Sequence, residues 1–413
     1  MGLDEFSLCL GETFFSGKSV SGFVKLRCGT DLTNINHIQV KVVGFAHVQW
    51  NERIKVVLPY GSRFKNQQYR REKTIYYENH VDLLNRKQII HSGDILEGEH
   101  VIPFEAELPA DLPCSFEGQY GHIRYYVEAK LDRSGIFTSN KRQRQFITVL
   151  SLVDLNEIPG ADQPVAISRE KEFNTNCCFI DGGYITVQLS LPRVYYTPGE
   201  FLPITSQIEN HSDITITKTT AKLIMDVVYH EVGGKTAKTS NILLARNQGK
   251  IKGGRSDGSW YELPLCTQEP GAGCYSKPQW TAVSPIPSLP PSTMAGYNYC
   301  NVIECGYRLE FSIFAKGYDR PFIIIGIPLT IGSVPLRKIP PSSLDSKAEE
   351  YATPSALAAS PLPADEANGL PPPSYAEAVA IDVLPPKIMP RTSDSKDTHA
   401  NWDFKPKYPV WPS

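Results

Sequence analysis

Apolar and polar residues alternate with a period of two along most of the chain up to about residue 334. In residues 37–50, Ile38 and Val40 share one side of an extended chain, and Gln39 and Lys41 share the other. The same alternation recurs in three later windows, His122–Asp132, Ile185–Leu191 and Tyr307–Ile313. Such alternation places one face on a core and the other in water, as in antiparallel sheets. No window of comparable length has a helical period, so the pattern predicts an all-β fold.

Turn sequences separate these runs. They are Ser16-Gly17, Pro198-Gly199, Gly233-Gly234 and Gly253-Gly254. Many strands without intervening helices are typical of a sandwich or barrel. Because 413 residues exceed what one hydrophobic core normally organises, we expect two such domains rather than one.

A faint repeat supports two related halves. Phe14–Val24 and Tyr195–Ile208 each contain an aromatic pair, a turn with glycine and then a strand, with Gly17 and Gly199 in matching places. Between the halves, the sequence is polar and poorly patterned. We therefore predict an N-terminal sandwich at residues 1–153, a linker at 154–175 and a C-terminal sandwich at 176–336.

The composition changes after Pro335. Fifteen of the 33 prolines fall in Pro335–Ser413, and Ser, Ala and Asp fill much of the rest. Such a segment has too little apolar surface to offset the entropy of ordering it. Residues 337–413 are therefore predicted to form a disordered, proline-rich tail.

Charge and hydropathy indicate a soluble protein. The formal net charge is −2 and the charges are mixed along the chain, which predicts no nucleic-acid partner. The start, MGLDEF, lacks the basic and apolar regions of a secretory signal. The longest apolar stretch, Pro321–Ile331, is too short to span a bilayer. We expect a cytoplasmic protein.

The nine cysteines are scattered, and their odd number argues against a fully paired disulfide framework. One group, Cys266, Cys274, Cys300 and Cys305, invites a zinc interpretation. Its spacings lack the paired CxxC pattern of a zinc site. Buried or loop thiols are the favoured interpretation, and the sequence predicts no metal and no cofactor.

No known catalytic pattern is found. The sequence contains no GxSxG, HExxH, Walker glycine loop or GxGxxG, and its nine histidines show no ligand-like pairing. The glycine-rich segment Gly249–Gly258 has no GK[ST] and fits a hairpin loop. The sequence therefore predicts a protein that is not an enzyme.

Three stretches together resemble the α-arrestin branch of the arrestin superfamily. Leu108–Arg133, LPADLPCSFEGQYGHIRYYVEAKLDR, is similar to that branch's LPxxLPxSFEG and GxIRYxxxAxLxR signature. Pro198–Glu200 with Ile208–Ile216 resembles the start of the arrestin C-domain. Tyr307–Ile313 with Ile327–Leu336 resembles its closing strands.

This resemblance covers residues 1 to about 336 and implies two arrestin-type, immunoglobulin-like β-sandwiches. Within the first signature, Gly118 and Gly121 are expected to permit a tight turn, and Arg124 to make an internal polar contact. A fold does not by itself define a function. The more specific expectation about function therefore comes from the sequence of the tail.

The tail contains a PPxY motif at Pro372, Pro373, Ser374 and Tyr375. Consecutive prolines hold an extended polyproline II backbone that loses little entropy on binding. WW domains recognise such segments, and the tyrosine fills a second pocket. Pro372, Pro373 and Tyr375 are therefore the predicted WW-binding residues. A phosphate on Ser374 or Tyr375 would place charge in an apolar groove and is expected to weaken binding.

α-Arrestins commonly carry two PPxY copies. Near the end of this chain, the segment around Pro406–Tyr408 resembles a second copy that lacks the paired prolines. Whether it binds WW domains stays open on the sequence alone. If one site is functional, the avidity of two tandem contacts is lost.

The resemblance implies an adaptor that recruits WW-domain HECT-type ubiquitin ligases to membrane receptors or transporters, promoting cargo ubiquitination, endocytosis and sorting. It would associate with the plasma membrane and endosomes peripherally, through cytosolic regions of its cargo. The alternative is an arrestin-fold trafficking or signalling scaffold that works through its sandwiches without recruiting a ligase. An enzyme with a non-standard site is the third, less favoured, interpretation.

Overall fold

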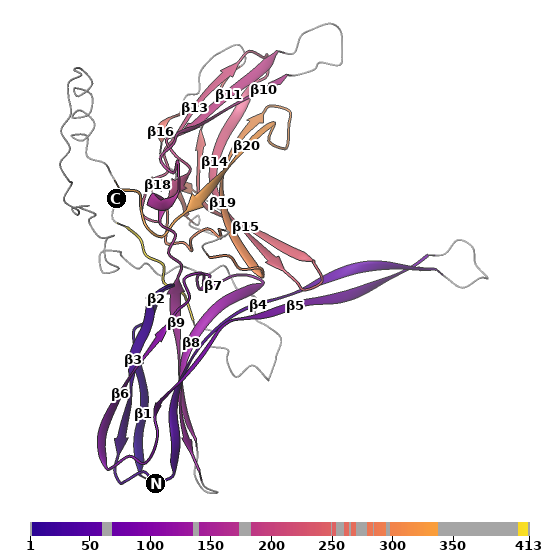
Figure 1. The fold of residues 1–413 in the computed structure, drawn as a ribbon. Coiled ribbons are helices and arrows are strands. Elements are labelled where there is room, and N and C mark those ends of the chain that lie inside the picture. Colours follow the sequence, from indigo (N-terminus) through magenta and orange to yellow (C-terminus); the bar gives the residue numbers. More distant parts are fainter. Residues whose placement is uncertain are drawn as a thin grey trace, which may run out of the picture.

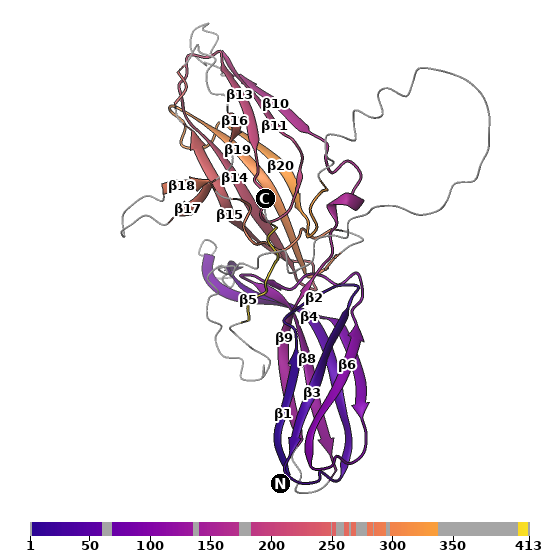
Figure 2. The ribbon, with the colours of Figure 1, turned by 90° about the vertical axis from the view of Figure 1, so that its left-hand side faces the viewer.

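The computed structural model describes residues 2–59, 68–134, 140–172, 183–248, 250–252, 260–263, 266–269, 279–283, 285–294, 298–337 and 404–411. Their regular structure is β-strand apart from one 3-10 turn, η1 (Leu155–Glu157). Two elongated β-sandwiches lie end to end (Figures 1 and 2). Across these ranges, no helix has the length and apolar character needed to cross a membrane. The predicted all-β, two-sandwich architecture is confirmed.

The N-terminal sandwich pairs a three-stranded sheet, in the order β1-β3-β6, with a six-stranded sheet in which β2-β9-β8-β4-β5 follow one another and β7 joins β8. The strands are β1 (Leu3–Leu10), β2 (Thr13–Phe15), β3 (Ser19–Cys28), β4 (Ile35–Pro59), β5 (Gln68–His91), β6 (Gly98–Glu107), β7 (Phe116–Glu117), β8 (Gly121–Arg133) and β9 (Lys141–Leu150). The alternating apolar residues of β4, such as Ile38 and Val40, are buried between the sheets, as predicted.

The C-terminal sandwich has the same general design. A four-stranded sheet in the order β10-β11-β13-β16 faces a seven-stranded sheet in the order β12-β20-β19-β14-β15-β17-β18. The strands are β10 (Val165–Glu172), β11 (Tyr184–Leu191), β12 (Tyr195–Tyr196), β13 (Ile204–Asn210), β14 (Ile216–His230), β15 (Thr236–Gln248), β16 (Trp260–Leu263), β17 (Cys266–Glu269), β18 (Gln279–Val283), β19 (Ile303–Ala315) and β20 (Ile323–Ile331). Most of the buried apolar residues of both sandwiches belong to one contiguous cluster.

Strand β10 lies inside the segment that the sequence assigns to a linker. It pairs with β11 over its whole length, from Val165 opposite Leu191 to Glu172 opposite Tyr184. β10 is an edge strand, and most of its side chains are exposed. An edge strand that buries so little surface needs few apolar residues, which is why its sequence looks like a linker. The connection without strands is therefore shorter than residues 154–175.

The internal repeat is real and extends beyond the aromatic-glycine turns. Strand β2 pairs in parallel with β9, and β12 pairs in parallel with β20, so the two halves open in the same way. Gly17 and Gly199 have φ angles of 72° and 98°, which favour glycine at both turns. The repeated turn predicted from the sequence is thus a repeated structure.

A second repeated feature is a Leu-Pro-x-Ser corner ahead of the long central strand of each sandwich. Ser115 donates its N–H to the Val149 carbonyl (2.8 Å), and its hydroxyl accepts the Val149 N–H (2.9 Å). Ser292 makes the same two bonds with Ile331, at 2.8 and 2.9 Å. Each serine therefore stands in for a strand residue and ties its corner to the last strand of its sandwich.

A buried tyrosine holds each corner from the other side. Tyr125 on β8 donates its hydroxyl to the Pro113 carbonyl (2.7 Å). Tyr307 on β19 does the same to Pro290 (2.6 Å). Burial raises the pKa of both phenols well above the ordinary value, so both stay protonated donors at physiological pH. The two corners are thereby fixed where the sandwiches meet.

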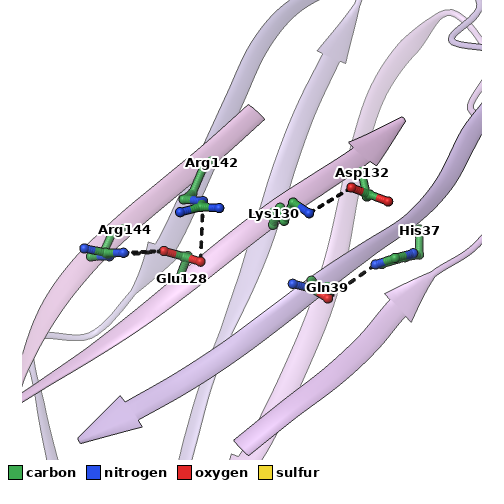
Figure 3. Close-up of polar contacts among 7 residues, drawn as sticks. All are labelled: His37, Gln39, Glu128, Lys130, Asp132, Arg142 and Arg144. Carbon is green, nitrogen blue, oxygen red and sulfur yellow. Dashed lines mark hydrogen bonds and ion pairs between the residues drawn. The ribbon is translucent and has the colours of Figure 1, made fainter. Parts of the chain in front are cut away.

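Charges on the solvent side of the N-terminal sheet are paired with one another, both between strands and within one strand. Arg144 on β9 donates to the Glu128 carboxylate on β8 (2.6 Å), and Lys130 pairs with Asp132 at 2.8 Å (Figure 3). The Arg144 guanidinium also lies 4.3 Å from the centroid of the Tyr126 ring. The Arg144–Glu128 pair joins β9 to β8 and contributes to strand register as a cross-strand pair, whereas Lys130 and Asp132 both lie on β8.

Arg124 makes the internal polar contact that the sequence predicts. Its guanidinium forms two hydrogen bonds to the Glu117 carboxylate, at 2.5 and 3.0 Å, and both side chains are almost fully buried. Beside it, the Gly118 N–H donates to the Gly121 carbonyl (2.9 Å), which is the expected tight turn. A bidentate pair of this kind fixes the turn between β7 and β8.

Replacing Arg124 with methionine should lower the free energy of unfolding by about 3 kcal/mol, because the change leaves a buried carboxylate without its cation. Urea unfolding followed by circular dichroism measures it. Lys130→Met is the matched control, since its ion pair with Asp132 is more accessible to solvent. A loss at position 124 no larger than at position 130 would contradict a buried pair.

Candidate functional site

The predicted WW-binding residues, Pro372, Pro373 and Tyr375, lie outside the described residues, so the structure does not place them. The tail is described again from Phe404 to Trp411, and this part includes the degenerate Pro406–Tyr408 segment. We call Phe404–Trp411 the C-terminal clasp. It runs between the two sandwiches, as the yellow segment of Figure 1 shows.

The region where the sandwiches meet is built first by the chain segments that leave and enter them. The Val153 N–H donates to the Ser333 hydroxyl (2.8 Å), and the Ser333 N–H donates back to the Val153 carbonyl (3.0 Å). At the start of η1, Leu155 N–H donates to the Val334 carbonyl (3.2 Å). The end of the first sandwich is thus bonded to the end of the second.

A second contact between the sandwiches lies beside the β4–β5 hairpin. The Tyr120 and Tyr229 rings meet edge to face, with centroids 5.5 Å apart. Asn79 on β5 donates its side-chain amide to the His230 carbonyl on β14 (3.1 Å). Desolvation raises the pKa of the Tyr229 phenol. Gly118 is required here, because a β-carbon at that position would overlap the Tyr229 hydroxyl.

Tyr408 anchors the clasp to both sandwiches. Its hydroxyl donates to the Ser115 carbonyl of the first sandwich (2.8 Å), and its carbonyl accepts the Ser288 hydroxyl of the second (2.9 Å). The ring packs with Cys114 and Leu150 in a small apolar cluster and leaves only 3% of the residue exposed. Burial raises the Tyr408 pKa well above the ordinary value, which keeps the hydroxyl a donor.

Trp411 anchors the other end to the C-terminal sandwich. Its indole N–H donates to the Ser333 carbonyl (2.9 Å), and its backbone N–H donates to the Pro198 carbonyl (3.0 Å). A β-carbon on Gly199 would overlap the Trp411 backbone. The Pro-Gly-Glu turn at 198–200, which the sequence identifies as a domain start, is thus also the seat of this tryptophan.

The clasp also extends over the first sandwich before it reaches the junction. Its Lys407 ammonium pairs with Glu12 at 2.7 Å, and its Lys407 N–H donates to the Thr148 hydroxyl (3.3 Å). The Phe404 ring lies against Phe146 on β9, with centroids 5.6 Å apart. The sequence does not reveal this role, because proline-rich composition alone predicts a solvated tail.

Two buried thiols face each other across the junction. Cys114 lies within the first corner and Cys305 lies on β19, and both line a small cavity between the sandwiches. Desolvation raises the pKa of each to about 12, so each is a neutral thiol at physiological pH. All five cysteines whose side chains are described are free. Cys274 and the side chain of Cys266 lie outside the described part.

The structure brings together three histidines that the sequence leaves unpaired. His47 on β4 lies opposite His80 on β5 and opposite His122 on β8. The ring centroid of His47 is 5.8 Å from that of His80 and 5.5 Å from that of His122. Strand register, which the sequence does not show, makes them neighbours. Within the described ranges, no three His, Cys, Asp or Glu residues are arranged to hold a metal ion.

The β4–β5 hairpin carries a local charge that the overall charge hides. β8 accompanies β4 only to Val48, whereas β5 pairs with it to Pro59, and the outer ribbon projects from the sheet (Figure 1). Its described strands, 51–59 and 68–76, hold five basic and two acidic residues: Arg53, Lys55, Arg70, Arg71, Lys73, Glu52 and Glu72. A basic arm therefore exists in a chain whose net charge is −2.

Iodoacetamide at pH 8 should alkylate Cys114 and Cys305 about a thousandfold more slowly in the native protein than in urea, because a pKa of about 12 leaves little thiolate. Stability from the protonated thiols is present below the unfolded pKa and is lost as pH rises toward 12. Peptide mass spectrometry after timed labelling gives the rates. Half-buried Cys9 is the control. Equal native rates at Cys9 and Cys114 would refute the assignment.

Comparison with known proteins agrees with this architecture. The family model for the N-terminal domain of arrestin, or S-antigen, matches residues 10–156, and the model for its C-terminal domain matches residues 181–336. Arrestin domain-containing protein 17 of Caenorhabditis elegans is 24% identical over 343 residues, 81% of this chain and 71% of that protein. Arrestin domain-containing protein 1 of Mus musculus is 27% identical over 374 residues, 89% and 73% of the two chains.

The two matched domain models cover both sandwiches in order, and the relatives extend over most of the chain. The Leu108–Arg133 signature forms the corner, buried ion pair and central strand described above. The chain belongs to the arrestin superfamily, in its branch of arrestin domain-containing proteins, the α-arrestins.

Proposed function

We propose that this protein is a cytoplasmic adaptor that brings WW-domain HECT-type ubiquitin ligases to membrane receptors or transporters. The observation that carries the proposal is a PPxY motif at Pro372–Tyr375, placed after two arrestin sandwiches. Membership of the arrestin family supports an adaptor rather than an enzyme. Ubiquitination of the cargo would follow from proximity, and endocytosis and sorting from the attached ubiquitin.

The chemistry of the motif supports the ligase half of the proposal. Pro372 and Pro373 follow Pro371, so three consecutive prolines favour the polyproline II backbone that WW grooves accept. Tyr375 would supply the aromatic anchor, the kind of residue that dominates small interfaces. The protein would reach the plasma membrane and endosomes through its cargo.

A trafficking scaffold that works without a ligase is the second candidate. In this case the sandwich surfaces would bind the partners, and the tail would be a passive extension. Deleting all of Pro335–Ser413 would not separate the two candidates cleanly, because it also removes the clasp that packs between the sandwiches. A point change in the motif leaves the clasp in place.

Tyr375→Ala should weaken binding to a WW-domain ligase by about 30-fold, the effect of removing a central aromatic anchor worth about 2 kcal/mol. The full-length protein and the variant are compared by pull-down and mass spectrometry, and the affinity is then measured by calorimetry. Tyr351→Ala is the matched control, because Tyr351 belongs to the same tail but follows no proline pair.

Equal recovery of the ligase by the wild type and Tyr375→Ala would end the ligase proposal and favour the scaffold. Loss of ligase together with persistence of the cargo on the cell surface would support the adaptor. Cargo traffic that continues normally with Tyr375→Ala would show that the sandwiches act without the motif.

A further inference from the structure

The C-terminal clasp is held as a docked peptide rather than as a strand of either sandwich. None of its residues belongs to a β-strand, and Pro406 and Pro409 lack the N–H that a strand ladder needs. Its bonds to the sandwiches come instead from a few separate groups, chiefly those of Tyr408 and Trp411. Separate anchors on an extended backbone are the usual way in which a folded domain recognises a peptide.

The side chains of the two anchor residues bind groups from different sandwiches. Tyr408 reaches the Ser115 carbonyl in the first corner, and Trp411 reaches the Ser333 carbonyl after the last strand of the second sandwich. The site therefore exists only where both sandwiches are present, and its occupant ties them together.

The fit is specific in shape as well as in hydrogen bonding. Tyr408, Val410 and Trp411 are each at least 92% buried. The Tyr408 hydroxyl and carbonyl and the Trp411 indole and backbone N–H groups have partners in the sandwiches, as the bonds above show. Gly199 leaves the space through which the Trp411 backbone passes. A buried tyrosine and tryptophan with satisfied polar groups are typical of the residues that dominate binding.

We propose that the domain junction is a peptide-binding site for an extended segment with a tyrosine and a tryptophan three residues apart and proline beside the tyrosine. Its ligand is the chain's own C-terminal clasp, bound in cis. The site recognises Tyr408 through the Ser115 and Ser288 groups and Trp411 through Ser333 and the Pro198-Gly199 turn.

This assignment gives the degenerate PPxY copy a different role. A WW domain would need the Tyr408 ring, which the junction encloses. The clasp and a WW domain therefore exclude each other at Tyr408, and Pro372–Tyr375 is left as the chain's WW site. The Arg337 N–H donates to the Asn156 side chain (2.9 Å), so the chain is bonded to the sandwiches at Arg337 as well as at the clasp.

The clasp belongs to the same chain as its binding site, and this covalent connection determines how an added peptide should bind. A segment joined covalently to its site competes at an effective concentration on the order of 1 mM, so the wild type should resist an added peptide. Disabling the clasp within the full-length chain should open the site. The double variant Tyr408→Ala and Trp411→Ala does this while it retains every other residue.

The test measures binding of a fluorescent peptide, residues 401–413, to full-length protein by anisotropy. The double variant should bind at least tenfold more tightly than the wild type. A peptide carrying both alanine changes should not bind, and adding Ser288→Ala to the double variant should weaken binding several-fold by removing the donor to the Tyr408 carbonyl. Equal binding to the wild type and the double variant, or binding to neither, would overturn the proposal.

A second measurement on unaltered protein covers the case in which the double variant does not fold. The Trp411 N–H, bonded to the Pro198 carbonyl, should exchange with deuterium as slowly as amides of the sandwich edges. Exchange of the Trp411 N–H at the rate of an unprotected peptide would also overturn the proposal. Neither readout involves a ligase, so failure here and failure of the Tyr375→Ala prediction are distinguishable.

Discussion

The hydrogen bonds of two serines, Ser115 and Ser292, are the constraint on which the rest of the molecule depends. Each closes a Leu-Pro-x-Ser corner onto the final strand of its sandwich and satisfies a strand edge that would otherwise be left with unpaired groups. The buried tyrosines Tyr125 and Tyr307 lock the same corners from the central strands. Because both corners lie at the meeting point of the sandwiches, their position decides what the junction can hold.

The junction is stabilised mainly by polar groups that have partners and by large buried side chains. Val153 and Ser333 join the backbones of the two domains, and Tyr120 and Tyr229 pack across them. A polar group buried at the junction without a hydrogen-bond partner would cost free energy of folding. Each buried carbonyl of the corners therefore favours a hydrogen-bond donor beside it. The clasp supplies donors from Tyr408 and Trp411, which links the end of the chain to the orientation of its two domains.

Much of the fold could be predicted from the sequence, because period-two alternation reports directly on sheets with one buried face. The aromatic-glycine turns are recognisable because their residues are adjacent in the sequence. Arg124 is recognisable because it belongs to the Leu108–Arg133 signature, and its partner Glu117 is only seven positions away. Edge strand β10 was missed, since a strand that buries few side chains has no such pattern. The second repeat, Leu-Pro-x-Ser, is visible in the letters but gains its meaning only from the bonds that its serines make.

The sequence by itself determined the two β-sandwiches, their order and a PPxY motif, because these depend on local patterning and on residues adjacent in the chain. Tertiary structure alone decided that His47 lies between His80 and His122 and that Tyr408 is buried. Those outcomes depend on strand register and on contacts between residues up to about three hundred positions apart, such as Ser115 and Tyr408. Hydrophobic periodicity carries no information about such pairings, since it reports which face of a segment is buried and not what covers it.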